Sequence, residues 1–334
     1  MRKYPFFLSI VVPVYNGADT VGELVQALAE LAVPGGHEVI LVVDGSPDRS
    51  LEVARRLLDS TTVPLTVVDH ARNFGEHNSV LTGLRHARGA WVVTMDDDLQ
   101  NPPSEVLRLV GHARDNGLDA VYTCYATKEH AAWRNLGSRF TNRVADWLLD
   151  KPKGLYLSSF RCLSAFVVEQ VTRYTGPFPY IDGLVMQATQ KVGTLEVKHL
   201  PRAAGRSNYN FRRLVRLWMN MFVNFSVMPL RLSTLCGLGI SALGALGVFW
   251  VVGESMIRNT PPGWSSLMAA VLLLSGVQLL ILGIVGEYLG RLYLTANGKP
   301  QGIVRAVERN EAAEEAGGRA GKPAPEVVAL KQHG

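Results

Sequence analysis

The sequence predicts an α/β protein with a mostly parallel sheet, followed by an interfacial helix and two membrane-spanning helices. Two observations predict this architecture. Short apolar runs alternate with helical segments up to about residue 228, and two long apolar stretches follow. Alternating β and α segments favour a sheet that is covered by helices on both faces. The chain of 334 residues would then place a cytoplasmic domain over residues 1–210 and a membrane part after it.

The predicted strands are short, apolar runs over Leu8–Val14, Glu38–Val43, Leu65–Val68, Trp91–Met95 and Ala120–Tyr122. Helical patterns lie between them, over Thr20–Leu31, Ser50–Leu58 and Ser79–Ala87. The start of the chain imitates a signal peptide. Its apolar run is short, ends at Pro13 and has no small-residue cleavage site after it, so we interpret it as the first strand.

Polar residues gather where successive predicted strands end. These segments are Pro13-Val14-Tyr15-Asn16, Asp44-Gly45-Ser46, Arg72-Asn73-Phe74-Gly75 and the acidic run Asp96-Asp97-Asp98. Ligands bind at the carboxyl edge of open α/β sheets, so this pattern is typical of a nucleotide site. Asp44 could accept a hydrogen bond from a base or a ribose, although Asp-Gly-Ser is also a common turn signal. The chain has no Gly-x-Gly-x-x-Gly or Walker loop, so a metal ion and basic side chains must handle phosphate.

Asp96, Asp97 and Asp98 follow a run rich in β-branched and aromatic residues and precede Leu99-Gln100-Asn101 and two prolines. Three acids packed together repel one another unless a cation holds them. Hard oxygen ligands suit Mg2+ or Mn2+, which in turn suit a diphosphate. A solvated acidic turn is the alternative, and the neighbouring strand-end motifs favour the metal site.

Two apolar stretches, over about 232–252 and 267–288, are each long enough to cross a hydrocarbon core of about 30 Å. The loop between them carries only Arg258 against Glu254. Basic residues instead flank the pair, which predicts that the catalytic domain and both termini are cytoplasmic. These residues are Arg202, Arg206, Arg212, Arg213, Arg216 and Arg231 before the first stretch, and Arg291, Lys299, Arg305 and Arg309 after the second.

Residues 211–229 are predicted to form an interfacial amphipathic helix, because apolar residues recur at i, i+3, i+4 and i+7 beside arginines. Ordinary packing on the catalytic domain is the alternative. Residues 291–334 are expected to form a cytoplasmic tail. The tail should be disordered after about residue 308, where Ala, Gly, Glu and Pro dominate.

Cysteine content and charge exclude several classes. The three cysteines, Cys124, Cys162 and Cys236, have no metal or redox spacing and imply no disulfide framework. The net charge of +5 is modest and its basic residues concentrate beside the predicted membrane helices. Anionic lipid is therefore a better expected partner than nucleic acid.

Together these motifs resemble the family-2 glycosyltransferases of GT-A fold, and more narrowly the polyprenyl-phosphate glycosyltransferases with two C-terminal transmembrane helices. Within that group the chain is most similar to the undecaprenyl-phosphate 4-deoxy-4-formamido-L-arabinose transferases, and it also resembles dolichol-phosphate mannosyltransferase-like enzymes. The likeness spans residues 7 to about 305. Besides the strand-end segments, the motifs that carry it are Val11-Val12-Pro13, Gly205-Arg206-Ser207-Asn208-Tyr209 and Gly286-Glu287-Tyr288-Leu289-Gly290-Arg291-Leu292-Tyr293.

The resemblance implies roles position by position. Asp96 and Asp98 match an Asp-x-Asp metal pair, and Gln100 matches a further metal ligand. Asp97 stands where the family usually has Ala, so we expect it to be dispensable. Positions that match nucleotide contacts are Pro13, Tyr15, Asn16, Asp44, Asn73 and Asp96. Positions that match contacts to the donor diphosphate or the acceptor phosphate are Arg134, Arg202, Arg206 and Ser207.

The chain departs from the family pattern at three other positions. Gly17 replaces the acid that usually follows Tyr-Asn, and Val43 replaces the first acid of Asp-Asp-Gly-Ser. Both lie near the expected base or ribose, so they leave the donor open. Asn208 replaces the Lys that closes Gly-x-Ser-Lys, which removes a cation that Arg206 could replace.

The resemblance implies an inverting transfer of a sugar from a nucleotide-sugar donor to polyprenyl (undecaprenyl) phosphate, for cell-envelope glycan or lipid modification. The nucleophile would be an ionised phosphate oxygen, which makes a strong general base dispensable. A Mg2+ or Mn2+ cofactor, a place in the bacterial inner membrane and a homotetramer are also implied. Asp182 could orient the acceptor or cap a helix, and Glu287 could pair with Arg291 or contact another subunit.

Two other functions stay open. A processive polysaccharide synthase would carry a Gln-x-x-Arg-Trp motif and usually more membrane spans, and neither is found in the sequence. A non-catalytic membrane adaptor on a degenerate transferase fold would agree with the departures at Gly17, Val43 and Asn208. The intact acids argue against that adaptor.

Overall fold

The computed structural model describes residues 4–125, 155–198 and 263–310, with Leu200, residue 312 and separate stretches between 230 and 249. The chain divides into two units. One consists of Met1–Asn208 with Pro300–Gly334, and the other of Tyr209–Lys299.

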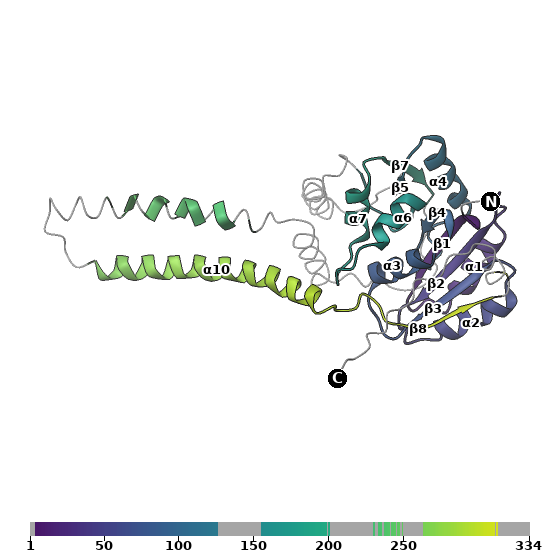
Figure 1. The fold of residues 1–334 in the computed structure, drawn as a ribbon, viewed down its shortest axis with the longest axis horizontal. Coiled ribbons are helices and arrows are strands. Elements are labelled where there is room, and N and C mark those ends of the chain that lie inside the picture. The colour runs from purple at the N-terminus through teal and green to yellow at the C-terminus, as the bar shows by residue number, and fades with distance from the viewer. Residues whose placement is uncertain are drawn as a thin grey trace. The chain divides into compact units, whose positions relative to one another are not determined.

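The first unit is built on an eight-stranded sheet of order β7-β5-β6-β4-β1-β2-β3-β8 (Figure 1). Strand β1 pairs in parallel with β2 and β4, β2 with β3, and β5 with β7. The pairings β4–β6, β5–β6 and β3–β8 are antiparallel. The strands are β1 Phe6–Val14, β2 His37–Val43, β3 Leu65–His70, β4 Gly89–Thr94, β5 Ala120–Tyr125, β6 Arg161–Ser164, β7 Val192–Val197 and β8 Val304–Arg309.

Helices cover both faces of this sheet, as the sequence predicts (Figure 1). Alternate residues of β1, such as Leu8 and Ile10, form the main core with α1, α2 and α4. Helix α3 packs on the opposite face against β1 and β2, next to α6 and α7. The helices are α1 Val21–Ala29, α2 Ser50–Ser60, α3 Glu76–His86, α4 Ser104–Asp115, α6 Ala165–Thr172 and α7 Ile181–Ala188.

The structure confirms the mostly parallel sheet and the five predicted strands, with ends shifted by up to three residues. Strands β6, β7 and β8 and helices α4, α6 and α7 were not predicted. Strand β6 has a weak sequence signal because it has only four residues and contains a fully buried charge, Arg161.

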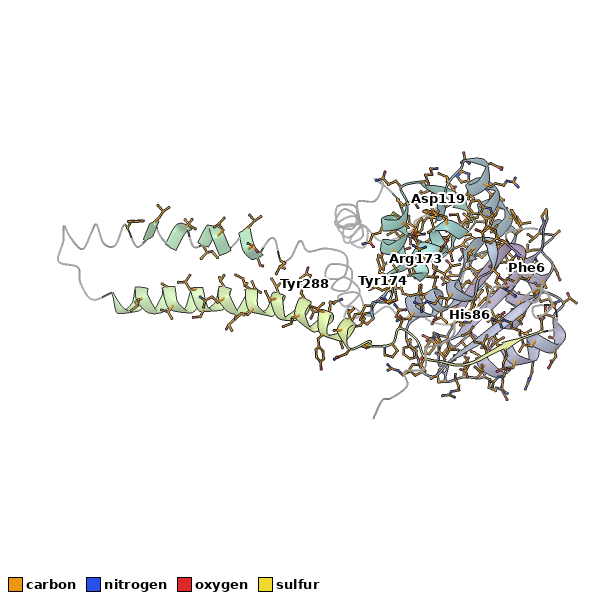
Figure 2. All side chains as sticks on the ribbon, in the orientation of Figure 1. Phe6, His86, Asp119, Arg173, Tyr174 and Tyr288 are labelled. Carbon is orange, nitrogen blue, oxygen red and sulfur yellow. The ribbon has the colours of Figure 1, made fainter. Side chains whose placement is uncertain are left out.

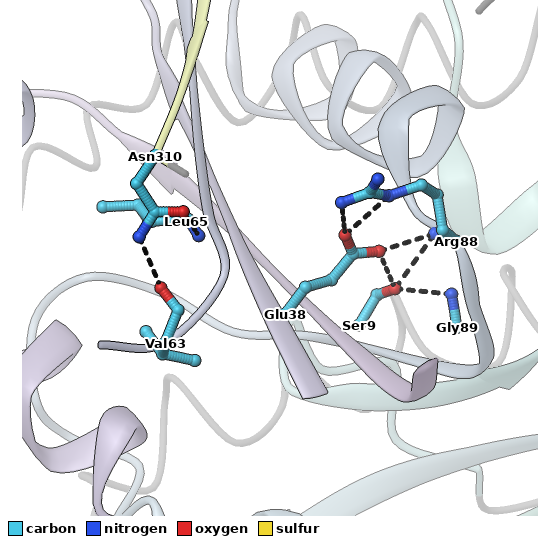
Figure 3. A network of polar contacts seen from close by, with 7 residues as sticks. All are labelled: Ser9, Glu38, Val63, Leu65, Arg88, Gly89 and Asn310. Carbon is cyan, nitrogen blue, oxygen red and sulfur yellow. Dashed lines mark hydrogen bonds and ion pairs between the residues drawn. The ribbon is translucent and has the colours of Figure 1, made fainter. Parts of the chain in front are cut away.

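Strand β8 changes the interpretation of the chain after residue 291. That segment was expected to be a tail, yet Val304–Arg309 pairs antiparallel with β3 and completes one edge of the sheet. Asn310 fixes its end, because its Oδ1 accepts from Leu65 N at 2.9 Å and its Nδ2 donates to Val63 O at 2.8 Å (Figure 3). Glu308 forms an ion pair with Arg55 at 2.7 Å.

The residue that leads into β8 is anchored as well. Gln301 Nε2 donates to the carbonyl oxygens of Tyr174 and Gly176 at 3.0 and 2.6 Å, and Arg85 donates to its Oε1 at 2.5 Å (Tyr174 is labelled in Figure 2). The backbone of Ala71 then donates to Ile303 O at 2.8 Å. Residues 301–310 are therefore anchored on the sheet of the first unit rather than forming part of a tail.

Buried polar groups also join the amino end of the sheet. Glu38 of β2 pairs with Arg88 at 2.7 Å and accepts from Ser9 Oγ of β1 at 2.7 Å (Figure 3). Ser9 Oγ in turn accepts from Gly89 N at 2.8 Å. This network fixes β4 against β1 at the edge opposite the polar loops.

The second unit contains helix α10, Trp264–Ala296, which runs further than the predicted stretch 267–288. Its segment Leu274–Ala296 has 23 residues and is long and apolar enough to cross a membrane. No other helix among the described residues meets both conditions. Glu287 pairs with Arg291 one turn on at 2.8 Å, which confirms that predicted contact. The structure describes the first predicted span only in separate stretches between residues 233 and 249, and the predicted helix 211–229 lies wholly outside the described residues.

Candidate functional site

The polar loops meet where strand order reverses. Strands β1, β2 and β3 follow one another outward in the sheet, whereas β4 lies on the other side of β1. The crevice at such a switch point, outside the carboxyl ends of parallel strands, is the usual ligand site of an open α/β sheet. Four loops border it, over residues 15–17, 44–48, 71–75 and 95–100.

The loop after β1 is held by the loop after β2. Asn16 N donates to Ser46 Oγ at 2.7 Å and Gly17 N to Ser50 Oγ at 3.0 Å. Asn16 has a φ of 57°, the left-handed region that is uncommon for residues with a side chain. The turn leaves the Tyr15 side chain 47% exposed. A pinned backbone with an accessible ring suits stacking on a flat ligand.

Asp44, at the end of β2, is buried and accepts three hydrogen bonds. Its Oδ1 accepts from His70 Nδ1 and from Phe74 N, both at 2.9 Å, and its Oδ2 accepts from Gly75 N at 2.8 Å. Burial alone would raise the pKa of this carboxyl, but the hydrogen bonds from His70, Phe74 and Gly75 lower it overall. Asp44 therefore holds the loop after β3 in place.

Two further contacts shape that loop. His70 Nε2 lies 3.1 Å from Thr82 Oγ1 of α3, so its ring bridges the strand and the helix. Gly45 has a φ of 57°, and a β-carbon there would overlap the backbone of Arg72. Glycine therefore allows the loops after β2 and β3 to touch. Asn73 stays exposed beside them.

Two carboxyl groups of the acidic run after β4, those of Asp96 and Asp97, have raised pKa values. Ser159 Oγ donates to Asp96 Oδ2 at 2.6 Å. Burial, together with the charges of Glu76 and Asp98, nevertheless raises the pKa of Asp96 to about 6. Burial and the two flanking acids raise the pKa of Asp97 to about 7. Two neighbouring carboxyls with raised pKa values form a site that favours a cation.

Asp98 and Gln100 are arranged by a tight backbone turn. Leu99 between them has a φ of 60°, and Gln100 N donates to Asp98 Oδ1 at 3.2 Å. The backbone of Gln100 accepts from Leu200 N at 2.9 Å. Backbone outliers of this kind concentrate at functional sites, where the surrounding structure supports their cost.

A buried ion pair supports the acidic loop from β6. Arg161 is 1% exposed and donates to the carboxylate of Asp182 in the first turn of α7. Its Nε also donates to Thr94 Oγ1, at the end of β4, at 3.2 Å. The described contacts of Asp182 are therefore internal. Sequence reasoning missed Arg161, because nothing in its short strand marks the residue as buried.

The structure brings seven of the predicted site residues to one edge of the sheet. They are Tyr15, Asn16, Asp44, Asn73, Asp96, Asp98 and Gln100. Pro13 lies one residue inside the end of β1, in register with Val42. Arg134, Arg202, Arg206 and Ser207 lie outside the described residues. Sequence reasoning did not find Glu76 or Ser159, which reach Asp96 from segments distant along the chain.

The donor set fits a hard divalent ion that shares its coordination with a ligand. Among the described residues, no three His, Cys, Asp or Glu side chains form a ready metal cage. Mg2+ is commonly held by one or two carboxylates plus substrate phosphates rather than by protein alone. The raised pKa values of Asp96 and Asp97 indicate that added positive charge would be stabilised at this position.

Comparison with known sequences identifies both parts of the chain. Residues 9–169 match the family described as Glycosyl transferase family 2, and residues 228–292 match the GtrB C-terminal hairpin. An undecaprenyl-phosphate 4-deoxy-4-formamido-L-arabinose transferase of Pseudomonas aeruginosa is 32% identical over 322 residues, covering 92% of this chain and 93% of the relative. An uncharacterized glycosyltransferase of Bacillus subtilis, YkcC, is 32% identical over 303 residues, covering 89% and 93%.

Solved structures give a weaker likeness. Glucosyl-3-phosphoglycerate synthase from Mycobacterium tuberculosis, in complex with Mn2+, uridine diphosphate and phosphoglyceric acid, is 16% identical with a TM-score of 0.48. The match covers 65% of this chain and 75% of that one.

Proposed function

Because this chain belongs to glycosyl transferase family 2, we propose that it transfers a sugar from a nucleotide-sugar donor to polyprenyl phosphate. Its relatives along nearly the whole chain include enzymes named for transfer to undecaprenyl phosphate. The observation that carries the proposal is the pair of acids with raised pKa values, Asp96 and Asp97, at the sheet's switch point, which the exposed Tyr15 also borders. A bound nucleoside diphosphate with its divalent ion would supply the missing positive charge and a base to stack.

Asp96 and Asp98 would hold Mg2+ or Mn2+, with Gln100 as a further oxygen donor. When bound, the ion would neutralise the negative charge that develops on the leaving diphosphate. Asp96 is partly buried and Ser159 fixes its orientation, so its carboxylate is held in place before the donor arrives. Such preorganisation avoids rearrangement during the reaction.

The loops after β1, β2 and β3 would bind the nucleotide. Tyr15 and Asn73 expose side chains to it, and Asn16 shapes the turn. The Asp44 carboxylate already accepts three hydrogen bonds from the protein, so we propose an indirect role for it in place of the direct nucleotide contact that the sequence resemblance implies. We assign it the role of positioning the Asn73–Gly75 loop.

The reaction would be an inverting displacement. An acceptor phosphate oxygen bonds to the anomeric carbon as that carbon's bond to the donor diphosphate breaks, and the electron pair leaves with the nucleoside diphosphate. The attacking phosphate is already ionised near neutral pH, so no side chain needs to remove a proton. Arg134, Arg202, Arg206 and Ser207 are proposed to bind the donor diphosphate and the acceptor phosphate.

The membrane part fits a lipid-linked acceptor. Helix α10 is long enough to span a bilayer and belongs to a segment that matches a C-terminal hairpin family. We propose that the chain spans the bacterial inner membrane twice, over about 232–252 and 267–288, with both termini cytoplasmic. The helix over 211–229 would then lie at the interface. We also propose a homo-oligomer, as the sequence resemblance suggests.

The sugar is the least constrained part of the proposal. Two relatives of equal identity bear different names, one specifying 4-deoxy-4-formamido-L-arabinose and one specifying no sugar. Gly17, Val43 and Asn208 differ from the family pattern at positions expected to meet the donor or the phosphate. We therefore leave the transferred sugar unspecified.

The test is a transfer assay with purified full-length protein, undecaprenyl phosphate, Mn2+ or Mg2+, and a panel of labelled nucleotide sugars. Extraction of a labelled lipid in the presence of metal, and its loss with EDTA, would support the proposal. Absence of any lipid-linked product from every donor, with nucleotide binding also absent, would instead support the non-catalytic adaptor. A labelled polymer would support a polysaccharide synthase.

A further inference from the structure

Asp97, the middle acid of the run, is set apart by where its carboxylate lies. Its Oδ2 is buried and has no hydrogen-bond partner among the described residues. It lies directly against the backbone of Gly17, so that a β-carbon on Gly17 would overlap Oδ2 and come within 3.0 Å of Cγ. The Asp97 carboxylate therefore occupies the space that a side chain at position 17 would need.

This contact joins the two sides of the switch point. Asp97 follows β4, whereas Gly17 ends the Tyr15–Gly17 loop after β1. The backbone of Tyr15 also faces the carboxyl group of Asp97 and lowers its pKa. A β-carbon on Gly17 would also lie 3.2 Å from Val14 Cγ1, which closes the space from the strand side. One side chain thus contacts the loop at Tyr15 and fills its turn at Gly17.

We propose that Asp97 and Gly17 form a matched pair in which Asp97 is a positioning residue for the nucleotide-binding loop. The chain departs from the family pattern by an acid gained at position 97 and an acidic side chain lost at position 17. In this proposal the first change compensates for the second. The acidic group is kept in the crevice but is supplied by the opposite loop. The part of the proposal that concerns the nucleotide rests on the proposed function.

The pairing has a steric and a chemical consequence. Any side chain at position 17 displaces either the Asp97 carboxylate or the Tyr15–Gly17 loop, because interiors packed this closely do not absorb an extra group. Loss of the carboxylate leaves an unfilled space beside the Tyr15–Gly17 loop. Both changes disturb the backbone that presents the Tyr15 ring.

The first test needs no substrate. Gly17→Ala, Asp97→Ala and the double variant are compared by thermal unfolding and by hydrogen exchange of the peptide that contains residues 14–18. Gly17→Ala should lower Tm by about 3–8 °C and speed exchange in that peptide. The same glycine change in the Asp97→Ala background should have less than half this effect. Effects that add in full would overturn the matched pair.

Matched controls separate this contact from general glycine or charge effects. Gly22→Ala places a β-carbon in open space on α1 and should leave Tm unchanged or slightly raised. Asp115→Ala removes an exposed acid at the end of α4 and should leave exchange of residues 14–18 unchanged. A loss of Tm in Gly22→Ala equal to that in Gly17→Ala would contradict the steric argument.

The second test concerns the nucleotide and uses the donor that the wild type turns over. Asp97→Ala should raise the donor KM about 10-fold and change kcat less than about 3-fold. The exchange variant Gly17→Glu/Asp97→Ala should recover at least half of the loss in kcat/KM seen in Gly17→Glu alone. A fall in kcat with an unchanged KM, or no recovery, would overturn the positioning role.

The two tests fail in different ways. If no donor is turned over, the proposed function fails, while the coupling in Tm and hydrogen exchange still decides the matched pair. If transfer occurs but the variants are additive in every measurement, the proposed function stands and the matched pair is wrong.

Discussion

The Asp44 loop and the acidic run lie at the same edge of one sheet, yet their carboxylates have opposite electrostatics. Hydrogen bonds from His70, Phe74 and Gly75 lower the pKa of Asp44. The pKa values of Asp96 and Asp97 are raised to about 6 and about 7 by burial and by neighbouring acids. The number of protein donors that face each carboxylate thus distinguishes them more clearly than residue type does.

The difference separates two functions of the crevice. The Asp44 carboxylate accepts three protein hydrogen bonds and contributes to the loop's shape. Asp96 accepts from Ser159, and the buried Oδ2 of Asp97 has no hydrogen-bond partner among the described residues, so burial of these two carboxyls is costly until a cation or a proton arrives. The comparison therefore supports our proposal that the β4 side of the switch point binds a cation, whereas the β2–β3 side shapes the loop.

Asp98→Asn should give the largest effect. It removes a charged ligand of the proposed ion, so turnover should fall by about 10³-fold in the lipid transfer assay. The metal-free protein should keep its Tm within about 2 °C, because the change relieves repulsion rather than breaking a packed contact. Near-normal turnover would place the ion elsewhere. Asp115→Asn, on the surface of α4, is the matched control and should be silent.

Asp44→Asn should show the reverse pattern. The amide of Asn would place its NH2 group against at least one of the N–H donors that Asp44 now accepts from, which belong to His70, Phe74 and Gly75. Because two donors would then face each other, the free energy of unfolding should fall by about 2–3 kcal/mol. Thermal unfolding should show this loss with and without Mn2+. A variant of unchanged Tm but lost donor binding would restore the direct nucleotide contact that the sequence resemblance implied for Asp44.

Affinity for Mn2+ should rise about 10-fold between pH 5.5 and pH 7.5 in the absence of nucleotide, because the ion competes with protons on the acidic run. The pKa values are raised in the folded state. The metal-free protein therefore gains stability from these groups below about pH 4 and loses it as pH rises through 6 and 7. Isothermal titration at several pH values measures the affinity. A pH-independent affinity would contradict raised pKa values at the ion's ligands.

Ser159→Ala should give the smallest effect. The hydroxyl donates to Asp96 and lowers the pKa of that carboxyl, so its loss should raise the pKa further. Mn2+ affinity at pH 6.5 should fall by about 5-fold, as expected for a net hydrogen-bond contribution of about 1 kcal/mol, and should recover at higher pH. Ser159→Thr keeps the hydroxyl and serves as the control. Equal weakening at all pH values would indicate a change in geometry instead.

The strand-end motifs could be predicted from sequence because each lies in one short segment with its own signal. The apolar run and the acids at Val93–Asp98, for example, can be recognised within one short segment. Because the strands of the α/β pattern are parallel, their carboxyl ends lie at one edge of the sheet. Arg161 and Asp182 could not be predicted in this way, because their contact joins two segments without periodic signals. The partner of Asp97 was equally hidden, since a glycine on another loop gives no sign of what fills its space. Sequence reasoning judged Asp97 dispensable only because the resembling family usually has Ala at that position.

Strand β8 is synthesised long after the strand with which it pairs, and this order affects when the sheet can be completed. Strand β3 is made early, but its antiparallel neighbour Val304–Arg309 follows helix α10 in the chain. A ribosome therefore completes helix α10 before the last strand of the sheet leaves the exit tunnel. Until then one edge of β3 presents unpaired backbone groups. The sheet can close only on chains that have been translated through helix α10, so a product truncated before residue 300 carries an open, association-prone edge.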